Sequence, residues 1–256
     1  MLQAHSLLWH YLWVAPNLLL LILAVLLWRR RLHKQYPVFM VFAVVTAIEQ
    51  MTVYAADVLP WVSPYAWWRV FGSGLLVEAL IKFALIGQIF GLMFGMYPSL
   101  AKLAKSLVSG AGVVLVLLAA VVAAYTPKNS SQWIVSDVHI FEQTIYMIEC
   151  GLILFLFVFA AYFKLRWSQF SFGITLGLGI SACVHLATWA VMANPDFSAL
   201  YHVPLVFLNM ATYHACVLIW FYYLLVPQKI TTRSEVSLPE HKLEIWNEEL
   251  ERLLQQ

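Results

Sequence analysis

Seven long apolar stretches set the strongest limit on how this chain can fold. Each is close to the roughly 20 residues that an α-helix needs to cross about 30 Å of hydrocarbon. With 62% hydrophobic and only 11% charged residues, the chain also lies far from the composition of a soluble domain. We therefore expect an all-α integral membrane protein, a bundle of seven transmembrane helices with spans at about 7–28, 36–59, 66–94, 107–125, 139–163, 170–192 and 204–226.

The Lys and Arg residues beside these spans predict the orientation. Only Arg69 and Lys128 flank the spans on one side, whereas ten basic residues flank them on the other: Arg29, Arg30, Arg31, Lys34, Lys102, Lys105, Lys164, Arg166, Lys229 and Arg233. Because basic loops stay in the cytoplasm, we expect the N-terminus outside and the C-terminus inside, in the bacterial cytoplasmic (inner) membrane. The net charge of +2 is spread over short clusters, so no nucleic-acid partner is indicated.

The chain divides into the bundle, residues 1–230, and a cytoplasmic tail, residues 231–256. In the tail, Ser237 and Glu240 have the spacing of a capping box at a helix start. Four apolar residues then recur at helical spacing: Leu243, Trp246, Leu250 and Leu253. We expect a short amphipathic helix whose apolar face docks a protein partner or a second copy of the chain, while membrane lipid surrounds the bundle.

Charged residues inside the spans are the main functional signal. An ionisable side chain at bilayer depth costs a few kcal/mol, so it normally faces the interior and has a partner. Glu78 and Lys82 are one helical turn apart, so each can neutralise the other. A self-neutralised pair that only fixes packing is the simplest interpretation.

Further polar residues occur at a similar depth on other spans. Glu49 lies midway along the second span, Tyr146 and Glu149 follow one face of the fifth, and His214 lies on the seventh. Together with Glu78 and Lys82, these residues predict one polar chamber that opens toward the outside. Within it, Lys82 would offer a counter-charge to an acidic ligand.

His185, His214 and Glu149 also suggest a metal site, because imidazole and carboxylate groups bind zinc, manganese or iron. The two histidines could alternatively hold a haem iron from both faces. However, the spacings His-x-x-x-His and Glu-x-x-His, which place two ligands on one helical face, are absent. A single histidine in an apolar helix is more often a packing residue held by a hydrogen bond than a metal ligand. The sequence therefore predicts no bound cofactor, with haem or a divalent metal as the alternative.

Small residues recur on the sixth span, at Gly173, Gly177 and Ser181, and the same face continues to His185. Such a face lets a neighbouring helix approach closely. We expect it to pack inside the bundle and to direct His185 into the protein. The three cysteines, Cys150, Cys183 and Cys216, all lie within apolar runs and are expected to be packing residues.

Three segments, "FEQTIYMIECGLILFLFVFAAYFKLRWSQFSFGITLGLGISACVHLA", "VEALIKFALIGQIFGLMFGMYPSLAKLAKSL" and "RRRLHKQYPVFMVFAVV", resemble an uncharacterised family of seven-transmembrane proteins in Acidobacteria-like bacteria. The resemblance implies the fold but no activity. In that family the positions of Gln88 and His185 tend to be acidic, which implies that a metal site at His185 is not a family property. In architecture alone the chain is similar to the seven-transmembrane input modules of bacterial histidine kinases.

These observations favour a non-enzymatic, receptor-like, sensor-like or complex-forming membrane subunit for signal transduction. It would bind a small ligand or protein partner through the polar chamber. The alternatives are a metal- or haem-binding membrane oxidoreductase and a proton or solute carrier. No nucleophile elbow or phosphate-binding loop is present, so the sequence favours a protein that is not an enzyme.

Overall fold

A computed structural model describes residues 5–94, 102, 106–114, 117, 131–162, 165, 167–192, 195–226 and 252. Throughout these ranges every regular element is a helix. The elements run along the chain as α1 (Leu7–Arg29), the short 3₁₀ helix η1 (Leu32–Lys34), α2 (Pro37–Val58), α3 (Pro64–Phe94), α5 (Ser131–Tyr162), α6 (Gln169–Met192) and α7 (Pro195–Leu225). The prediction of an all-helical chain is therefore confirmed.

Six of these helices are long and apolar enough to cross a membrane. They correspond to six of the seven predicted spans. The remaining one, 107–125, falls largely outside the described residues; in its first part the chain is helical over 106–114. The count of seven therefore stays a prediction, whereas a bundle of several membrane-compatible helices is established.

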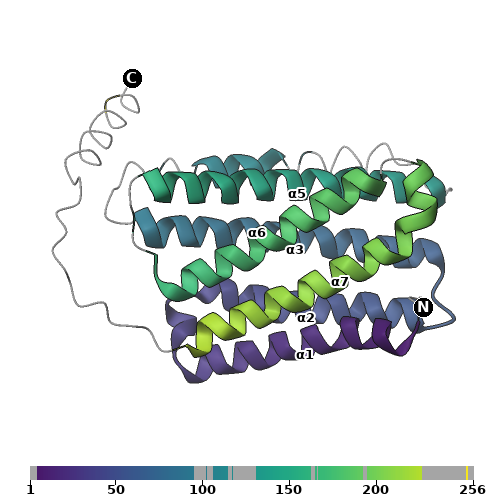
Figure 1. The fold of residues 1–256 in the computed structure, drawn as a ribbon, viewed down its shortest axis with the longest axis horizontal. Helices are drawn as coiled ribbons and strands as arrows, with labels where there is room; N and C mark the ends of the chain where they lie inside the picture. The colour runs from purple at the N-terminus through teal and green to yellow at the C-terminus, as the bar shows by residue number, and fades with distance from the viewer. Residues whose placement is uncertain are drawn as a thin grey trace.

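The six long helices form a closed ring. α1 packs on α2, α2 on α3, α3 on α5, α5 on α6, α6 on α7, and α7 returns to α1. Figure 1 shows the helices running along the long axis, with the end of α7 beside the end of α1. At that meeting point the guanidinium of Arg30 donates a hydrogen bond of 2.6 Å to the carbonyl of Leu224. The arrangement encloses an interior that all six helices can reach.

Local sequence signals set several helix ends. The hydroxyl of Ser6 accepts a bond of 3.3 Å from the backbone N–H of Trp9 and so caps α1. Pro37 occupies the first turn of α2, where its missing N–H leaves no helical bond unmade. By contrast, α1 and α7 continue through Pro16 and Pro204, which membrane helices tolerate when neighbouring groups satisfy the freed carbonyl.

The small-residue face of α6 packs against α7, as predicted. A Cβ added at Gly177 would lie 2.8 Å from a ring carbon of Trp220, and one at Gly173 would collide with Tyr223. The indole N–H of Trp220 donates to the carbonyl of Ile174 at 3.3 Å. Glycine is needed at these positions because only its missing side chain leaves room for the two large rings.

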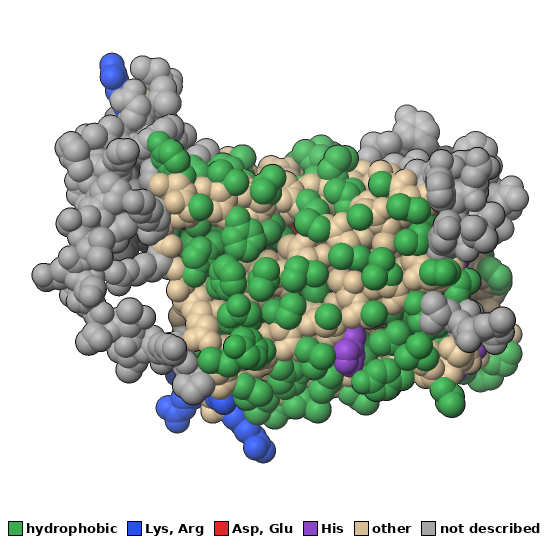
Figure 2. Space-filling view, viewed as in Figure 1, with side chains coloured by type: hydrophobic (Ala, Val, Ile, Leu, Met, Phe, Trp, Pro, Cys, Tyr) green, Lys and Arg blue, Asp and Glu red, His purple; other side chains and the backbone are tan. Residues whose placement is uncertain are grey.

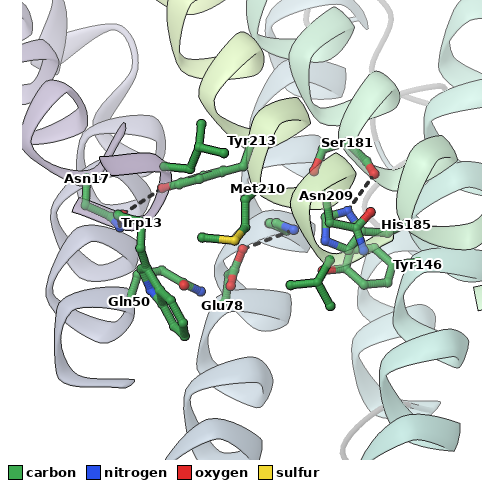
Figure 3. Close-up of a pocket in the computed structure, with 13 residues that line it drawn as sticks. Trp13, Asn17, Gln50, Glu78, Tyr146, Ser181, His185, Asn209, Met210 and Tyr213 are labelled. Carbon is green, nitrogen blue, oxygen red and sulfur yellow. Dashed lines mark hydrogen bonds and ion pairs between the residues drawn. The ribbon is translucent and has the colours of Figure 1, made fainter. Parts of the chain in front are cut away.

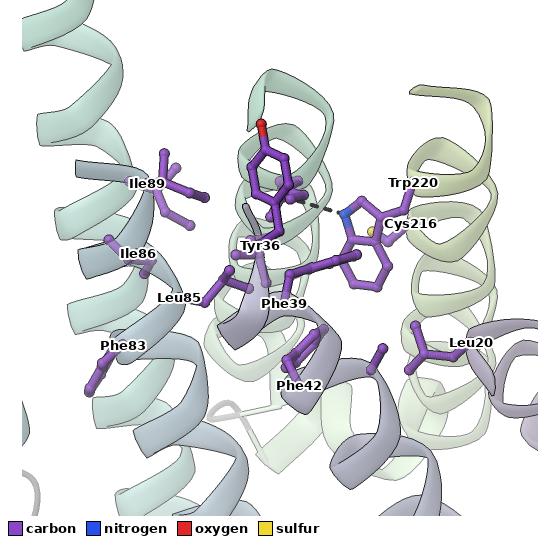
Figure 4. Close-up of a cluster of buried hydrophobic side chains, with 14 of the residues drawn as sticks. Leu20, Tyr36, Phe39, Phe42, Phe83, Leu85, Ile86, Ile89, Cys216 and Trp220 are labelled. Carbon is purple, nitrogen blue, oxygen red and sulfur yellow. Dashed lines mark hydrogen bonds between the residues drawn. The ribbon is translucent and has the colours of Figure 1, made fainter. Parts of the chain in front are cut away.

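Aromatic and aliphatic side chains fill the half of the ring nearest Arg30 (Figure 4). Phe39 and Phe42 meet the ring of Trp220 edge-on, with centroids 5.5 and 5.6 Å apart. At the end of this core, the Tyr36 hydroxyl forms hydrogen bonds with the hydroxyls of Ser168 (2.8 Å) and Ser171 (3.0 Å). Among the described residues, this half of the ring is a packed core.

Large hydrophobic side chains also cover the outside of the bundle. In Figure 2 they spread over the middle of the visible face, while the visible Lys and Arg side chains lie at one end. Many are well exposed on the ring's outer side, among them Leu18, Ile22, Ile48, Leu154, Leu208 and Leu218. Exposing this apolar surface to water would be energetically unfavourable, whereas contact with the lipid tails of a membrane would not. The chain is a membrane protein.

Candidate functional site

The half of the ring away from the packed core contains a cavity of about 180 Å³. Side chains from all six long helices line it: Leu12, Trp13, Asn17, Gln50, Glu78, Lys82, Tyr146, Ser181, His185, Val206, Asn209, Met210 and Tyr213. Figure 3 shows these residues converging from helices that are far apart in the sequence. A cavity of this size holds several water molecules or a small organic ligand.

Lys82 is the charged centre of one wall. Its Nζ atom lies 3.1 Å from Glu78 Oε1, one turn earlier on α3, and 3.5 Å from Glu149 Oε2 on α5. The lysine is also 5.2 Å from the centre of the Tyr146 ring, at a distance that suits a cation–π contact. The side chain of Glu149 is fully buried, and those of Lys82 and Glu78 are 7% and 13% exposed. The intrahelical pair is thus extended by a second carboxylate from another helix.

Glu149 lies behind this wall. Its Oε1 atom is buried and has no hydrogen-bond partner, although Oε2 faces Lys82. A carboxylate oxygen left in this state normally costs free energy, because burial removes the water that would solvate it. The contact with Lys82 through Oε2 therefore offsets part of the cost of burying this side chain.

Tyr146 and His185 form the neighbouring part of the wall. Their rings stack with centroids 4.4 Å apart and planes inclined by 26°. His185 Nδ1 donates a hydrogen bond of 2.9 Å to the carbonyl of Ser181, one turn earlier on α6. His185 thus points into the protein, as its place on the small-residue face predicted.

Two asparagines complete the polar lining. Tyr213 donates from its hydroxyl to Asn17 Oδ1 at 3.0 Å, which joins α7 to α1. On the other side, Thr188 donates to Asn209 Oδ1 at 3.1 Å and joins α6 to α7. Both bonds fix amide groups at the cavity wall, so the polar surface is held in place by the ring itself.

Glu49 is close to this wall without being among the residues that line the cavity. A side chain at Gly74 would collide with its carboxylate, so Glu49 lies over α3 one turn before Glu78. Its Oε2 atom is buried without a hydrogen-bond partner. Its neighbour Gln50 reaches the cavity instead.

His214 lies elsewhere. Its ring is 5.6 Å from that of Tyr11 on α1, and its Nδ1 atom is buried without a hydrogen-bond partner. His185 and His214 therefore have different neighbours. Within the described ranges, no three His, Cys, Asp or Glu side chains are grouped so that they could hold a metal ion.

Of the six chamber residues expected from the sequence, Glu78, Lys82 and Tyr146 line the cavity. Glu149 supports it through Lys82, Glu49 lies beside α3, and His214 packs against Tyr11. The four tail residues, Leu243, Trp246, Leu250 and Leu253, lie outside the described residues. Of the three cysteines expected to pack, Cys216 is buried and donates to the carbonyl of Gly177 at 3.1 Å. Cys150 is partly buried and Cys183 is exposed, with their sulfurs 3.8 Å apart.

Sequence reasoning missed Trp13, Asn17, Asn209 and Tyr213 as lining residues. Both asparagines stand in long apolar runs, "VAPNLLLL" and "VFLNMATY". A buried amide needs hydrogen-bond partners inside the bundle, and this signal would have placed both toward the interior. The aromatic residues gave no comparable signal, because rings are equally common on lipid-facing surfaces.

Comparisons with protein families, with curated proteins and with solved structures find no match to this chain. The functional inference therefore depends on the geometry of the cavity.

Proposed function

We propose that this protein is a receptor-like or complex-forming subunit of the bacterial inner membrane that binds a small ligand in its cavity. The observation that carries this proposal is the closed ring of six helices with a polar cavity to which every one of them contributes. A ligand in such a place touches all the helices at once. Its binding can therefore shift their relative positions, which is what a receptor requires.

The orientation predicted from the basic residues gives the ligand a direction of entry. Two residues that line the cavity, Trp13 and Asn17, lie in the first half of α1. The basic cluster Arg29 to Arg31 lies at the other end of this helix. Under the positive-inside rule, this half of the bundle faces outward. The ligand would then enter from outside the cell.

The tail would carry the response to the cytoplasm. Its apolar residues, Leu243, Trp246, Leu250 and Leu253, suit docking against a partner helix. Removing residues 238–256 should abolish capture of a partner protein or self-association of the full-length protein in detergent. Unchanged association would exclude the tail as the docking element.

The oxidoreductase alternative receives less support from the geometry. It depends on His185 and His214 acting together, and these residues contact different rings on different helices. His185 is also engaged with Ser181. We therefore build no function on this pair.

A thermal-stability screen with small molecules tests the proposal. Ligands of the cavity should raise the melting temperature of the purified protein, because binding to the folded state alone stabilises it. Replacing Val206, which lines the cavity on α7, by tryptophan should remove this stabilisation by filling the space. Leu208→Trp is the matched control, since Leu208 is 48% exposed on the same helix and faces away from the interior.

The expected result is a ligand whose effect survives in Leu208→Trp and disappears in Val206→Trp. If every stabilising compound acted equally on both variants, or if none stabilised the wild type, the cavity would not be a ligand site.

A further inference from the structure

More carboxyl groups than ammonium groups lie around the cavity. Lys82 is flanked by the carboxylates of Glu78 and Glu149, at 3.1 and 3.5 Å. Glu49 adds a third carboxylate, placed over Gly74 one turn from Glu78. Three carboxyl groups thus lie near one ammonium group, which pairs directly with two of them.

Two oxygens of this cluster are buried with no hydrogen-bond partner, Glu49 Oε2 and Glu149 Oε1. Uncompensated charge in a low-dielectric interior costs several kcal/mol per ion. Of the three acids only Glu78 lines the cavity, so a positive group that enters the cavity can pair with the Glu78 carboxylate. A negative group would raise the cost of the buried charge, because Lys82 already has two carboxylate partners. This geometry argues against the acidic ligand that Lys82 suggested in the sequence.

The remaining walls suit an organic cation better than a hydrated metal ion. Aromatic rings of Trp13, Tyr146 and Tyr213 line the cavity together with Met210. The face of an aromatic ring is negative and attracts ammonium groups. Lys82 itself already lies over the Tyr146 ring at 5.2 Å. Figure 3 shows Glu78 pointing toward the space between Trp13 and Tyr146, so a cation beside Glu78 would lie among these rings.

We propose that the cavity binds a small organic cation, a primary amine, with its positive group beside Glu78 and its apolar part against Trp13 and Met210. A cavity of about 180 Å³ suits a small compound of this kind. This inference rests on the proposed function, since it names the chemical class of ligand for the same cavity.

The test varies charge at constant shape. Butyl, cyclohexyl and benzyl compounds are each used as the amine, the alcohol and the carboxylate, and binding to the full-length protein in nanodiscs is measured by calorimetry. Only the binding that Val206→Trp abolishes is counted. Heat from compounds that partition into the lipid is thereby excluded, because this variant changes the cavity and not the lipid. In at least one series the amine should bind about tenfold or more tightly than its alcohol and carboxylate, since a charge-assisted contact and a ring contact are both gained.

Glu78→Gln should reduce amine affinity to that of the alcohol, while leaving alcohol affinity unchanged. Asp57→Asn is the matched control, because Asp57 is an acid on α2 near His5 (3.9 Å) and does not line the cavity. This control should bind amines as the wild type does.

The competing outcomes separate the two proposals. If an alcohol or a carboxylate occupied the cavity as tightly as its amine, the cation proposal would be wrong while a ligand-binding function would stand. If none of the nine compounds bound in a Val206-dependent way, the cation proposal would fail. The wider ligand screen would then decide independently whether the cavity binds anything.

Discussion

Lys82 has a different role at the residue scale from the one that its sequence position alone indicates. The spacing to Glu78 predicted a pair neutralised within one helix, and this pair is present. The structure adds Glu149 from α5 at 3.5 Å and the Tyr146 ring at 5.2 Å. The lysine therefore connects two helices of the ring and stabilises two acids at once.

Replacing Lys82 by methionine should destabilise the protein by about 3 kcal/mol or more, because it leaves buried carboxylates without a counter-ion. Denaturant unfolding in detergent measures this loss. The additional changes Glu78→Gln and Glu149→Gln should restore much of the lost stability. Arg69→Ala is the control, since Arg69 is an exposed cation and exposed charges contribute little. Equal effects at positions 69 and 82 would show that the buried cluster has no special energetic role.

Glu49 and Gln50 show what the sequence could not determine at this scale. Hydropathy gives the depth of a residue within a span, but adjacent residues point about 100° apart around a helix. Which of two adjacent residues faces the cavity depends on where the neighbouring helices lie. The sequence placed Glu49 in the chamber, whereas Gln50 lines the cavity and Glu49 lies over Gly74.

At the element scale, the spans were more predictable than their ends. Apolar length alone located six of the helices, because an apolar segment of about 20 residues can satisfy its own backbone hydrogen bonds in lipid by forming a helix. The apolar segments of α5 and α7, Phe141–Tyr162 and His202–Leu225, agree with the predicted spans 139–163 and 204–226. Both helices begin earlier, at Ser131 and Pro195, in stretches that contain polar residues, so hydropathy does not register these extensions.

The α6–α7 contact yields a prediction about packing. Gly177→Ala should destabilise the bundle by about 1–3 kcal/mol, because the added methyl group would overlap the ring of Trp220, which is itself buried and unable to move aside. Thermal unfolding of the purified protein measures the change.

Gly91→Ala on α3 provides the control, since nothing lies within 4 Å of a Cβ added there. Alanine favours a helix over glycine by up to about 1 kcal/mol, so this variant should be neutral or slightly stabilising. A Gly177→Ala protein as stable as Gly91→Ala would contradict the close packing of α6 on α7.

At the scale of the whole molecule, the ring divides into two halves with different roles. The half near Arg30 is filled by aromatic side chains, and the other half holds the polar cavity. The sequence indicated a shared chamber from depth alone. The closure of the ring from α7 to α1 depends on side-chain packing between distant segments, which no local pattern encodes.

The predicted orientation can be checked with reporter fusions. A fluorescent protein that folds only in the cytoplasm should be bright when fused after Gln256, and a periplasmic phosphatase should be inactive there. Fused within the short connection between α2 and α3, near Trp61, the phosphatase should be active. The reverse pattern would invert the bundle and direct the cavity toward the cytoplasm.

The central claim is that a water-accessible cavity lies inside the ring, and cysteine labelling tests it most directly. In a variant whose three cysteines are replaced by serine, Asn209→Cys should react with a membrane-impermeant thiol reagent added outside intact cells. Leu208→Cys, one residue away and 48% exposed on the outer side of α7, should remain unreactive because lipid covers it. The claim of a water-accessible cavity would be wrong if neither cysteine reacted. It would also be wrong if Leu208→Cys reacted as fast as Asn209→Cys.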